Sequence, residues 1–345
     1  MAPRTKRSSD SRNASGGPIT IRDVAREASV SPATVSRVIN AATSVAPETV
    51  ERVRAAVEKL NFVPSAAARS LSRKKTDTIG VLFPDISGPF FPGVIRGIEE
   101  ATAAAGYHLL IYSTALINTM SQPRFPLDAR STDGLIIGSD AVGEEFLRQI
   151  QAQRMPTILL HRGTYGMNLT CVTVDNRAGA QKAVEHLLSL GRRRVVHISG
   201  PADNDDAIWR ERGYRETLEG AGIGYDPALV FTGSYDEENG VEVVERLIGG
   251  NVSFDAIFAA NDEMAIGAIQ ALHANGCSVP HDVAVVGFGD IPLARYVHPA
   301  LTTVHIPIEE LGKRAAELLL AQIAGTPPEP MTVLPVELVI RQSSR

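Results

Sequence analysis

The segment 31–39 carries the side chains whose types and spacing most clearly suggest chemistry. Ser31 suits a helix N-cap, and Pro32 suits the first helical position, where its missing N–H costs nothing. Helical spacing from there buries Val35, Val38 and Ile39. The same spacing exposes Pro32, Ala33, Ser36 and Arg37 at the start of the helix. A guanidinium can bind O6 and N7 of guanine together, so a projecting helix of this kind could contact base edges.

Two further predicted helices would hold this one in place. Thr20 can cap the first helix, with Asp23 in the capping-box position, and a break follows at 29–31. The third helix opens at Pro47 and runs to Leu60 with an inward valine face. Two short helices joined by a tight turn and supported by a third form the arrangement that places the second helix in a DNA major groove. A generic three-helix bundle is the alternative.

Longer stretches resemble one protein family. The segment 20–40, TIRDVAREASVSPATVSRVIN, resembles the DNA-binding motif of the LacI/GalR family of bacterial repressors almost letter for letter. FVPSAAARSL at 62–71 resembles the hinge of that family. VLFPDISGPFFPGVIRGIEEA, ANDEMAIGAIQAL and HPALTTVHIPIEELG resemble landmarks of its effector domain. The resemblance covers Thr20 to about Arg341 and implies a sequence-specific DNA-binding transcription regulator of the repressor type.

The resemblance assigns roles within the first segment. The first two exposed residues of the recognition helix select bases in the family, and here they are Pro32 and Ala33, whose contacts would be apolar. Arg37 matches a base-contacting position. Phosphate contacts, which position the protein without specifying sequence, are implied for Thr20, Ser31, Thr34, Ser36 and Asn40. For Thr34 and Ser36, a simple helix-surface role stays open.

The stretch 65–71 matches the hinge helix of the family. It is too short to be stable alone, so we expect it to form when two copies pair on DNA. Leu71 matches the intercalating leucine, which opens the minor groove by unstacking a base step. The small side chain of Ala68 permits close approach of the two hinge helices. The alternative for Leu71 is an ordinary linker residue.

Apolar runs alternate with amphipathic stretches from Thr78 onward. We predict buried strands at IGVLF, YHLLIY, GLIIG, PTILL, RVVHISG, AIFAA and VAVVGF, separated by helices that often end in glycine. Such alternation indicates parallel sheets with helices on both faces. The predicted fold is an N-terminal all-α helix-turn-helix domain plus an α/β periplasmic-binding-protein-like effector domain made of two doubly wound parallel-sheet subdomains.

The predicted organisation has four parts. They are a disordered basic arm at 1–18, a helix-turn-helix domain at 19–63, a hinge helix and linker at 64–75, and an effector-binding and dimerisation domain at 76–345. By family analogy, the last part divides into an N-subdomain of about 76–174 and 289–324 and a C-subdomain of about 175–288 and 325–345. Ligands usually bind at the carboxyl ends of the strands of such sheets.

The resemblance places an effector pocket between these subdomains. The residues that match it are Phe90, Phe91, Arg210, Tyr235 and Asn261. Arg210 can fork onto hydroxyls or a carboxylate, and Tyr235 matches an aromatic residue that stacks on the ligand. The alternatives are core aromatic residues at Phe90 and Phe91 and a surface ion pair at Arg210.

The chain departs from the family in three places. Gly289 stands where a ligand-binding carboxylate is usual, unless Asp290 shifts to replace it. His161 stands where many members have an aspartate, and the stretch 113–132 is shorter than usual. Arg162 follows His161, and a pocket with fewer carboxylates, one more histidine and one more arginine suits an acidic effector, such as a sugar acid or sugar phosphate. A constitutive DNA-binding regulator with a degenerate effector pocket is the alternative function.

Bulk composition limits the other function classes. Residues 1–75 carry 14 Lys/Arg and 6 Asp/Glu, a balance of +8, so the rest of the chain carries −13. A basic N-terminal part followed by an acidic remainder suggests that the N-terminal part binds a polyanion. We find no enzyme motif, no metal-ligand spacing among the cysteines and histidines, and no apolar run long enough for a membrane span. The expected partners are a double-stranded DNA operator, a small-molecule effector and a second copy of the chain, in the cytoplasm and without a cofactor.

Overall fold

The computed structural model describes residues 19–39, 45–63, 75–114, 131–138, 141–160 and 167–345. It divides the chain into two compact units, Met1–Thr76 and Asp77–Arg345. The structures of the two units are described separately below.

Three helices make up the described part of the first unit: α1 (Ile21–Glu27), α2 (Pro32–Ile39) and α3 (Pro47–Lys59). Their buried core is small and is formed chiefly by Val24, Val35, Val53 and Phe62. The predicted caps are present. The Asp23 carboxylate accepts the backbone N–H of Thr20 at 3.0 Å, and the Ser31 hydroxyl accepts the N–H of Thr34 at 3.1 Å. These bonds satisfy helix-end donors, so they fix where α1 and α2 begin.

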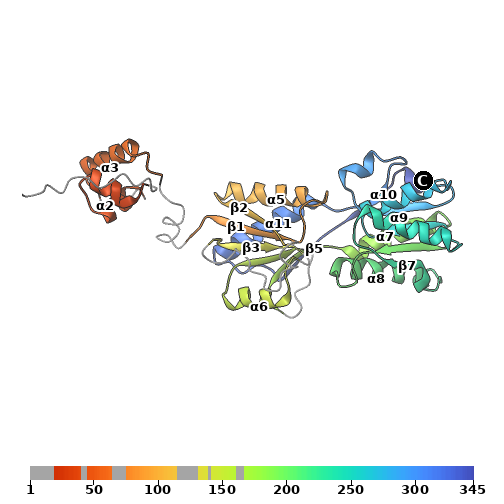
Figure 1. The fold of residues 1–345 in the computed structure, drawn as a ribbon. Helices are drawn as coiled ribbons and strands as arrows, with labels where there is room; N and C mark the ends of the chain where they lie inside the picture. Colours follow the sequence, from red (N-terminus) through yellow and green to blue (C-terminus); the bar gives the residue numbers. More distant parts are fainter. Residues whose placement is uncertain (1–18, 40–44, 64–74, 115–130, 139–140, 161–166) are drawn as a thin grey trace, which may run out of the picture. The chain divides into compact units, whose positions relative to one another are not determined.

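The second unit contains two six-stranded sheets. The first has the order β11-β5-β4-β3-β1-β2, and all of its neighbouring strands are parallel. Its strands are β1 (Thr78–Phe83), β2 (His108–Ser113), β3 (Gly134–Ile137), β4 (Thr157–Leu160), β5 (Thr170–Val174) and β11 (Met331–Leu334). Helices α5 (Phe91–Ala104) and α11 (Ile308–Ile323) cover one face, and α6 (Glu144–Ala152) covers the other (Figure 1).

The second sheet has the order β12-β10-β9-β8-β6-β7, with only the β10–β12 pair antiparallel. Its strands are β6 (Val195–Ser199), β7 (Val230–Thr232), β8 (Ala256–Ala259), β9 (Ala284–Gly289), β10 (Thr302–His305) and β12 (Glu337–Val339). Helices α7 (Asn176–Ser189) and α8 (Asp205–Gly220) pack on one face. Helices α9 (Glu237–Gly249) and α10 (Asp262–Ala274) pack on the other. Short 3₁₀ turns lie at Pro227–Leu229, Pro292–Arg295 and Gln342–Ser344.

Burial on both faces explains why most strands are continuous apolar runs. In β1, Ile79, Val81 and Phe83 point toward α5 and α11, and Leu82 points toward α6. Among the strands that we predicted to be buried, the exception is β2. It lies at the edge of the first sheet, and Leu110 is 41% exposed, because an edge strand has a neighbour on one side only.

The sheets divide the chain differently from the predicted subdomain boundaries. Strand β10 hydrogen-bonds to β9 in the second sheet, although we assigned 289–324 to the N-subdomain. Strand β11 pairs with β5 in the first sheet, although we assigned 325–345 to the C-subdomain. The chain therefore passes between the sheets three times: after β5, between β10 and α11, and between β11 and β12. Both misplaced strands have four residues, too few for a sequence pattern to reveal their partners.

Glycines bring α5 and α11 into close contact. A Cβ at Gly97 would overlap the backbone carbonyl of Glu309, and one at Gly312 would overlap that of Val94. Each helix therefore presents a glycine where the backbone of the other crosses it. This close packing fixes the start of α5, which carries Phe91 at the edge of a cavity.

Candidate functional site

The start of α2 projects from the first unit as the sequence predicted. Ser31, Pro32, Ala33 and Arg37 are exposed, while Val35 lies in the core. Thr34 and Ser36 are half-buried. Within the described part of the chain, no carboxylate forms an ion pair with Arg37. The guanidinium is thus available to an outside partner, and nothing in the described fold depends on it.

The hydroxyl groups predicted to contact phosphate also form hydrogen bonds within the first unit. The Thr20 hydroxyl donates to the Asp23 carboxylate at 2.6 Å, and the Ser31 and Thr34 hydroxyls lie 2.9 Å apart. The Thr20 hydroxyl is the largest cause of the lowered pKa of Asp23. Four other predicted site residues lie outside the described residues: Asn40, Ala68, Leu71 and His161.

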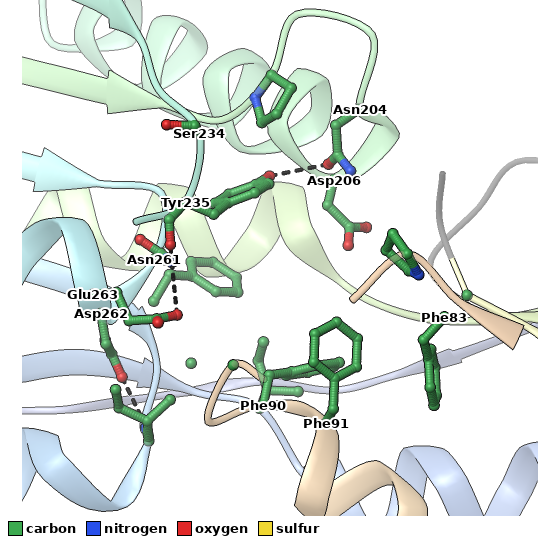
Figure 2. A pocket seen from close by; sticks show the side chains of 18 of the residues that line it. Phe83, Phe90, Phe91, Asn204, Asp206, Ser234, Tyr235, Asn261, Asp262 and Glu263 are labelled. Carbon is green, nitrogen blue, oxygen red and sulfur yellow. Dashed lines mark hydrogen bonds between the residues drawn. The ribbon is translucent and has the colours of Figure 1, made fainter. Parts of the chain in front are cut away.

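A cavity of about 380 Å³ lies in the second unit, between the carboxyl ends of the two sheets (Figure 2). Its volume falls within the ~300–1,000 Å³ typical of small-molecule pockets. Parallel strands bring their carboxyl ends together, so the loops that follow them meet here. The lining comprises Phe83, Pro84, Gly88, Phe90, Phe91, Gly138, Leu160, Pro201, Asn204, Asp206, Arg210, Ser234, Tyr235, Asn261, Asp262, Glu263, Phe288, Gly289, Ile291 and Ile306.

Aromatic rings form the wall of this cavity that belongs to the first sheet. Phe91 lies 5.0 Å from Phe83 and 5.6 Å from Phe90 between ring centroids, with Phe90 edge-on. Figure 2 shows Phe90 and Phe91 side by side, across the cavity from Tyr235. An apolar wall of aromatic rings suits the C–H face of a carbohydrate ring or another flat ligand.

Tyr235 is held at the opposite wall by its neighbours. Its hydroxyl donates to the Asn204 side-chain oxygen at 3.0 Å, and its carbonyl accepts from the Asn261 amide at 2.7 Å. Its φ is 69°, in the left-handed region. A Cβ at Gly200 would overlap the Tyr235 ring, so the ring can lie here only because residue 200 has no side chain.

Arg210 is buried, with 5% of its surface exposed. Its Nε donates to the Asn176 side-chain oxygen at 2.8 Å, and Nη1 donates to the carbonyl of Ala260 at 2.6 Å. Its guanidinium lies 4.0 Å over the Phe288 ring. Nη2 is 3.8 Å from the Asp206 carboxylate. The surface ion pair considered as an alternative for Arg210 is therefore wrong, because both side chains of the pair with Asp206 are largely buried.

Asn261 lies in the cavity lining, but its side chain is already engaged. The oxygen caps α10 by accepting the Met264 N–H at 3.0 Å. The amide donates to the carbonyl of Tyr235 and to the Glu263 carboxylate, the latter at 3.3 Å. Asn261 thus joins the turn at Tyr235 to the start of α10.

Two carboxyl groups lie beside Asn261. Asp262 accepts from the Thr303 hydroxyl and from the Ile291 N–H. Burial raises the pKa of Asp262 to about 6, although these two bonds lower it. Burial, followed by the nearby Asp262 carboxyl, raises the pKa of Glu263 to about 7. Charge at this end of the cavity is therefore costly without a partner.

Asp290 does not replace the missing pocket carboxylate, and that prediction is wrong. The backbone has a positive φ at both Gly289 and Asp290, 139° and 57°. The Asp290 side chain is 3% exposed and contacts Arg341 at 2.5 Å and His305 Nδ1 at 3.0 Å. Asp290 instead links the C-terminal segment, through Arg341, to β10, through His305. The fold brings these two partners to Asp290 from other parts of the sequence.

The sequence reasoning missed two carboxyl groups of the lining, Asp206 and Glu263. It placed the third, Asp262, at the strand end beside Asn261 but preferred Asn261 as the ligand contact. A signal for Asp206 was available, since it lies four residues before Arg210 and helical spacing puts the two on one face. Glu263 follows Asn261 in the motif that we singled out. Because the described lining contains three carboxyl groups, the expectation of a pocket with fewer carboxylates is wrong.

No group of described residues has the donors and spacing to hold a metal ion. No helix among the described residues is long and apolar enough to cross a membrane.

Comparisons with known proteins agree with this arrangement. Residues 20–65 match the model of the bacterial regulatory proteins of the lacI family, and residues 184–344 match the periplasmic binding protein-like domain. The HTH-type transcriptional regulator GalS of Salmonella typhimurium is 36% identical over 311 residues, covering 89% of this chain and 91% of GalS. The ribose operon repressor of Halalkalibacterium halodurans is 36% identical over 330 residues, covering 94% and 97%.

Solved structures show the same fold. A lac repressor dimer bound to operator and the anti-inducer ONPF superposes with a TM-score of 0.80 at 26% identity, covering 95% of this chain and 99% of that one. A complex of the transcriptional regulator CelR with cellobiose gives a TM-score of 0.70 at 30% identity, covering 94% and 99%. With the helix-turn-helix unit and the two-sheet unit both matched, the chain belongs to the LacI family of bacterial transcription regulators.

Proposed function

We propose that this protein is a repressor that binds a near-palindromic operator as a homodimer and is controlled by a carbohydrate-related effector. The observation that carries the proposal is a cavity of about 380 Å³, lined from both sheets, in a chain that also has an exposed recognition helix. A constitutive DNA-binding regulator has no need of such a cavity. Relatives that include a ribose operon repressor and a regulator solved with cellobiose support the effector class.

In this proposal the start of α2 reads the operator. Arg37 binds a guanine through O6 and N7, and Pro32 and Ala33 make apolar contacts such as those with a thymine methyl. Thr20, Ser31, Thr34, Ser36 and Asn40 contact phosphates and fix the register of the helix. Pro32 and Ala33 lack polar side-chain groups, so they cannot hydrogen-bond to bases. Part of the discrimination between DNA sequences therefore depends on the deformability of the DNA around Leu71 and Ala68 of the hinge.

The effector acts by changing the balance between the arrangements of the two sheets. Three chain passages join the sheets, which suits a hinged closure around a ligand. The coupling is reciprocal, so an effector that weakens operator binding also binds the operator complex less tightly. No enzymatic step is part of this function, and the protein acts on the chromosome in the cytoplasm.

The test is a measurement of operator affinity with and without effectors. Sites bound across the genome are mapped first, and a duplex containing the enriched palindrome is then used in fluorescence anisotropy. The proposal predicts specific binding that a carbohydrate present at saturation changes by about 5- to 150-fold, the usual range of allosteric coupling. Specific binding that none of a broad carbohydrate panel alters would favour the constitutive regulator.

A further inference from the structure

The turn 289–291 begins at the last residue of β9 and has an unusual backbone conformation. Gly289 has a φ of 139° and Asp290 has a φ of 57°, so two successive residues have positive φ. Glycine adopts such values readily, but a residue with a side chain keeps them only when its surroundings hold it there. Residues held in this way are concentrated in the ligand-binding and switching segments of proteins. The conformation therefore points to a role for this turn beyond joining β9 to the next segment.

Successive residues of the turn face different parts of the second unit. Gly289 and Ile291 line the cavity. The Ile291 N–H donates to the Asp262 carboxylate at 2.8 Å, which ties the turn to the start of α10. Asp290, between them, is not among the described lining residues, and its side chain is only 3% exposed. A ligand in the cavity can thus contact the turn without contacting the carboxylate of Asp290.

The Asp290 carboxylate connects two segments that border chain passages between the sheets. His305 Nδ1 lies 3.0 Å from one oxygen, and His305 is the last residue of β10, directly before the passage 306–307. Arg341 Nη2 lies 2.5 Å from the other oxygen, and Arg341 follows β12, the strand that begins directly after the passage 335–336. The carboxylate therefore joins the strand that enters one passage to the segment that leaves another.

The backbone of the turn contacts the passage 306–307 as well. The Gly289 carbonyl accepts the N–H of Ile306 at 3.4 Å, and the Asp290 N–H donates to the Thr303 hydroxyl of β10 at 3.4 Å. Both hydrogen bonds are long, whereas the charged contacts of Asp290 with His305 and Arg341 are shorter, and charge-assisted bonds are the stronger kind. The side chain of Asp290 is therefore the main connection between the turn and β10.

The residue before the turn, Phe288, reaches the other passage. A Cβ at Gly179 of α7 would come within 2.7 Å of the Phe288 ring and within 3.0 Å of Val336, so both side chains pack beside Gly179. Val336 belongs to the passage 335–336, and Phe288 lines the cavity. Residues 288–290 thus lie where the cavity and two of the three passages come together.

We propose that the turn 289–291 transmits effector binding to the chain passages, and that Asp290 is the positioning residue that sets the balance between the arrangements of the two sheets. This proposal rests on the proposed function, because it concerns how the same cavity controls the operator. A buried carboxylate is strongly destabilised when it loses a partner, so the turn favours the arrangement that keeps both His305 and Arg341 in contact. A ligand placed against Gly289 and Ile291 shifts the turn and alters these contacts, and the passages move with them.

The experiment measures the distance between the two sheets in the full-length, ligand-free protein by double electron–electron resonance. Spin labels are attached at Gln149→Cys on α6 and Glu242→Cys on α9, which are exposed positions over different sheets. Cys277→Ser prevents a third label, since Cys171 is buried. Labelled protein is mixed with an excess of unlabelled protein, so that the distance within one copy is measured. Asp290→Asn removes the charge but keeps a residue type that tolerates positive φ. We expect it to change the ratio of the two arrangements by about 5-fold or more, the lower end of usual allosteric coupling.

A second variant and a matched control accompany this measurement. His305→Ala should change the ratio in the same direction by less, because Arg341 remains; His305 is 44% exposed, so we expect the variant to fold. Asp255→Asn is the control. Its carboxylate accepts two backbone N–H groups at the amino ends of strands in the same sheet, away from the passages. It should leave the ratio within about twofold even where it lowers the melting temperature.

Wild-type distance distributions in Asp290→Asn and His305→Ala would overturn the proposal, and a lowered melting temperature alone would make Asp290 a structural anchor only. An equal shift in Asp255→Asn would also overturn it. If Asp290→Asn does not fold, the result for His305→Ala decides.

Operator affinity separates this proposal from the proposed function, because the distance measurement needs neither operator nor effector. We expect Asp290→Asn to change the affinity of the ligand-free protein for the enriched palindrome by a factor similar to the change in the ratio. If carbohydrates alter operator affinity while Asp290→Asn keeps the wild-type ratio, only the role of Asp290 fails. If the ratio changes but neither the variant nor any carbohydrate alters operator affinity, the proposed control of the operator fails and the transmission fails with it.

Discussion

Two arginines mark the contrast between the two units of this chain. Arg37 on α2 is exposed, and no described carboxylate pairs with it. Arg210 on α8 is buried, donates hydrogen bonds to Asn176 and Ala260, and lies over the Phe288 ring. Helix α2, proposed to contact DNA, thus presents a charged group that the first unit does not use. The cavity is lined by a charged group on which the second unit depends. Substitutions in the two units should therefore fail differently, one in recognition and one in stability.

The largest effect should follow from Arg210→Ala. Removal of the guanidinium leaves the Asn176 oxygen and the Ala260 carbonyl without their buried donor, and the Asp206 carboxylate without its neighbouring cation. We expect a loss of about 3–5 kcal/mol in unfolding free energy, as for a broken buried pair. Urea denaturation followed by circular dichroism measures it. Arg148→Ala, which breaks an exposed pair with Glu144, is the control and should cost less than about 1 kcal/mol. Similar losses in both would show that Arg210 is not part of the fold.

The second-largest effect should be a difference in how acid changes the stability of the two units, because the eight histidines all lie beyond residue 107. His197 is stacked between Tyr214 and Phe258, each ring centroid 4.9 Å away, and its Nδ1 donates to the carbonyl of Phe258. Burial lowers the pKa of His197 to about 4 from 6.5. Below pH 6.5 the unfolded chain takes up a proton that the folded chain refuses. His197 should therefore cost the second unit roughly 3 kcal/mol as the pH falls from 6.5 to 4.

The measurement compares wild type with His197→Phe across this pH range. The stability of the wild type relative to the variant should fall with pH in this window and stay constant above it. The comparison is needed because the raised pKa values of Asp262 and Glu263 act in the opposite direction: the folded chain holds protons there that the unfolded chain has lost. Parallel stability curves for the two proteins would contradict the burial argument.

Arg37→Ala tests the other side of the contrast. It should weaken binding to the best operator by ~1–3 kcal/mol and relax specificity at one base pair. Unfolding free energy should change by less than about 0.5 kcal/mol, since the side chain is exposed. Binding to a set of operators with single base changes measures both. Arg54→Ala on α3 is the exposed control and should not alter preference. A uniform loss across all sequences would make Arg37 a phosphate contact.

The smallest effect is expected at Ser31, where a cap and a predicted phosphate contact coincide. Ser31→Ala should cost about 1 kcal/mol of stability in the first unit, because the Thr34 N–H loses its acceptor. Ser31→Asp keeps an acceptor but adds negative charge. It should preserve the melting temperature and weaken operator binding at low salt. Unchanged operator affinity in Ser31→Asp would remove Ser31 from the phosphate contacts.

Local sequence was sufficient where function depends on one helix and its caps. Two hydrogen bonds that each span three residues, Thr20 to Asp23 and Thr34 to Ser31, set the starts of α1 and α2, so the exposed face followed directly. Apolar runs predicted most of the buried strands and the two-sheet architecture. They failed at the edge strand β2, and at β10 and β11, whose sheets are decided by partners more than a hundred residues away or by short pairings.

The cavity was only partly predictable for the same reason. Phe90, Phe91, Arg210, Tyr235 and Asn261 line it, as the family resemblance implied. Asp290 does not, because contacts with Arg341 and His305 draw its carboxylate into the fold. Asp206 was missed although it lies four residues before Arg210, because its contact with Asn176, thirty residues earlier, exists only in the folded chain.

The sequence by itself determined the family, the recognition helix and the layered α/β body, since these follow from local caps, periodicity and long motifs. Only the tertiary structure decided which charged groups face the cavity and which serve the fold. A carboxylate becomes a ligand contact or a structural anchor according to the donors around it, and those donors arrive from distant segments. Asp206 and Asp290 are the same residue type with different partners, and only Asp206 lines the cavity.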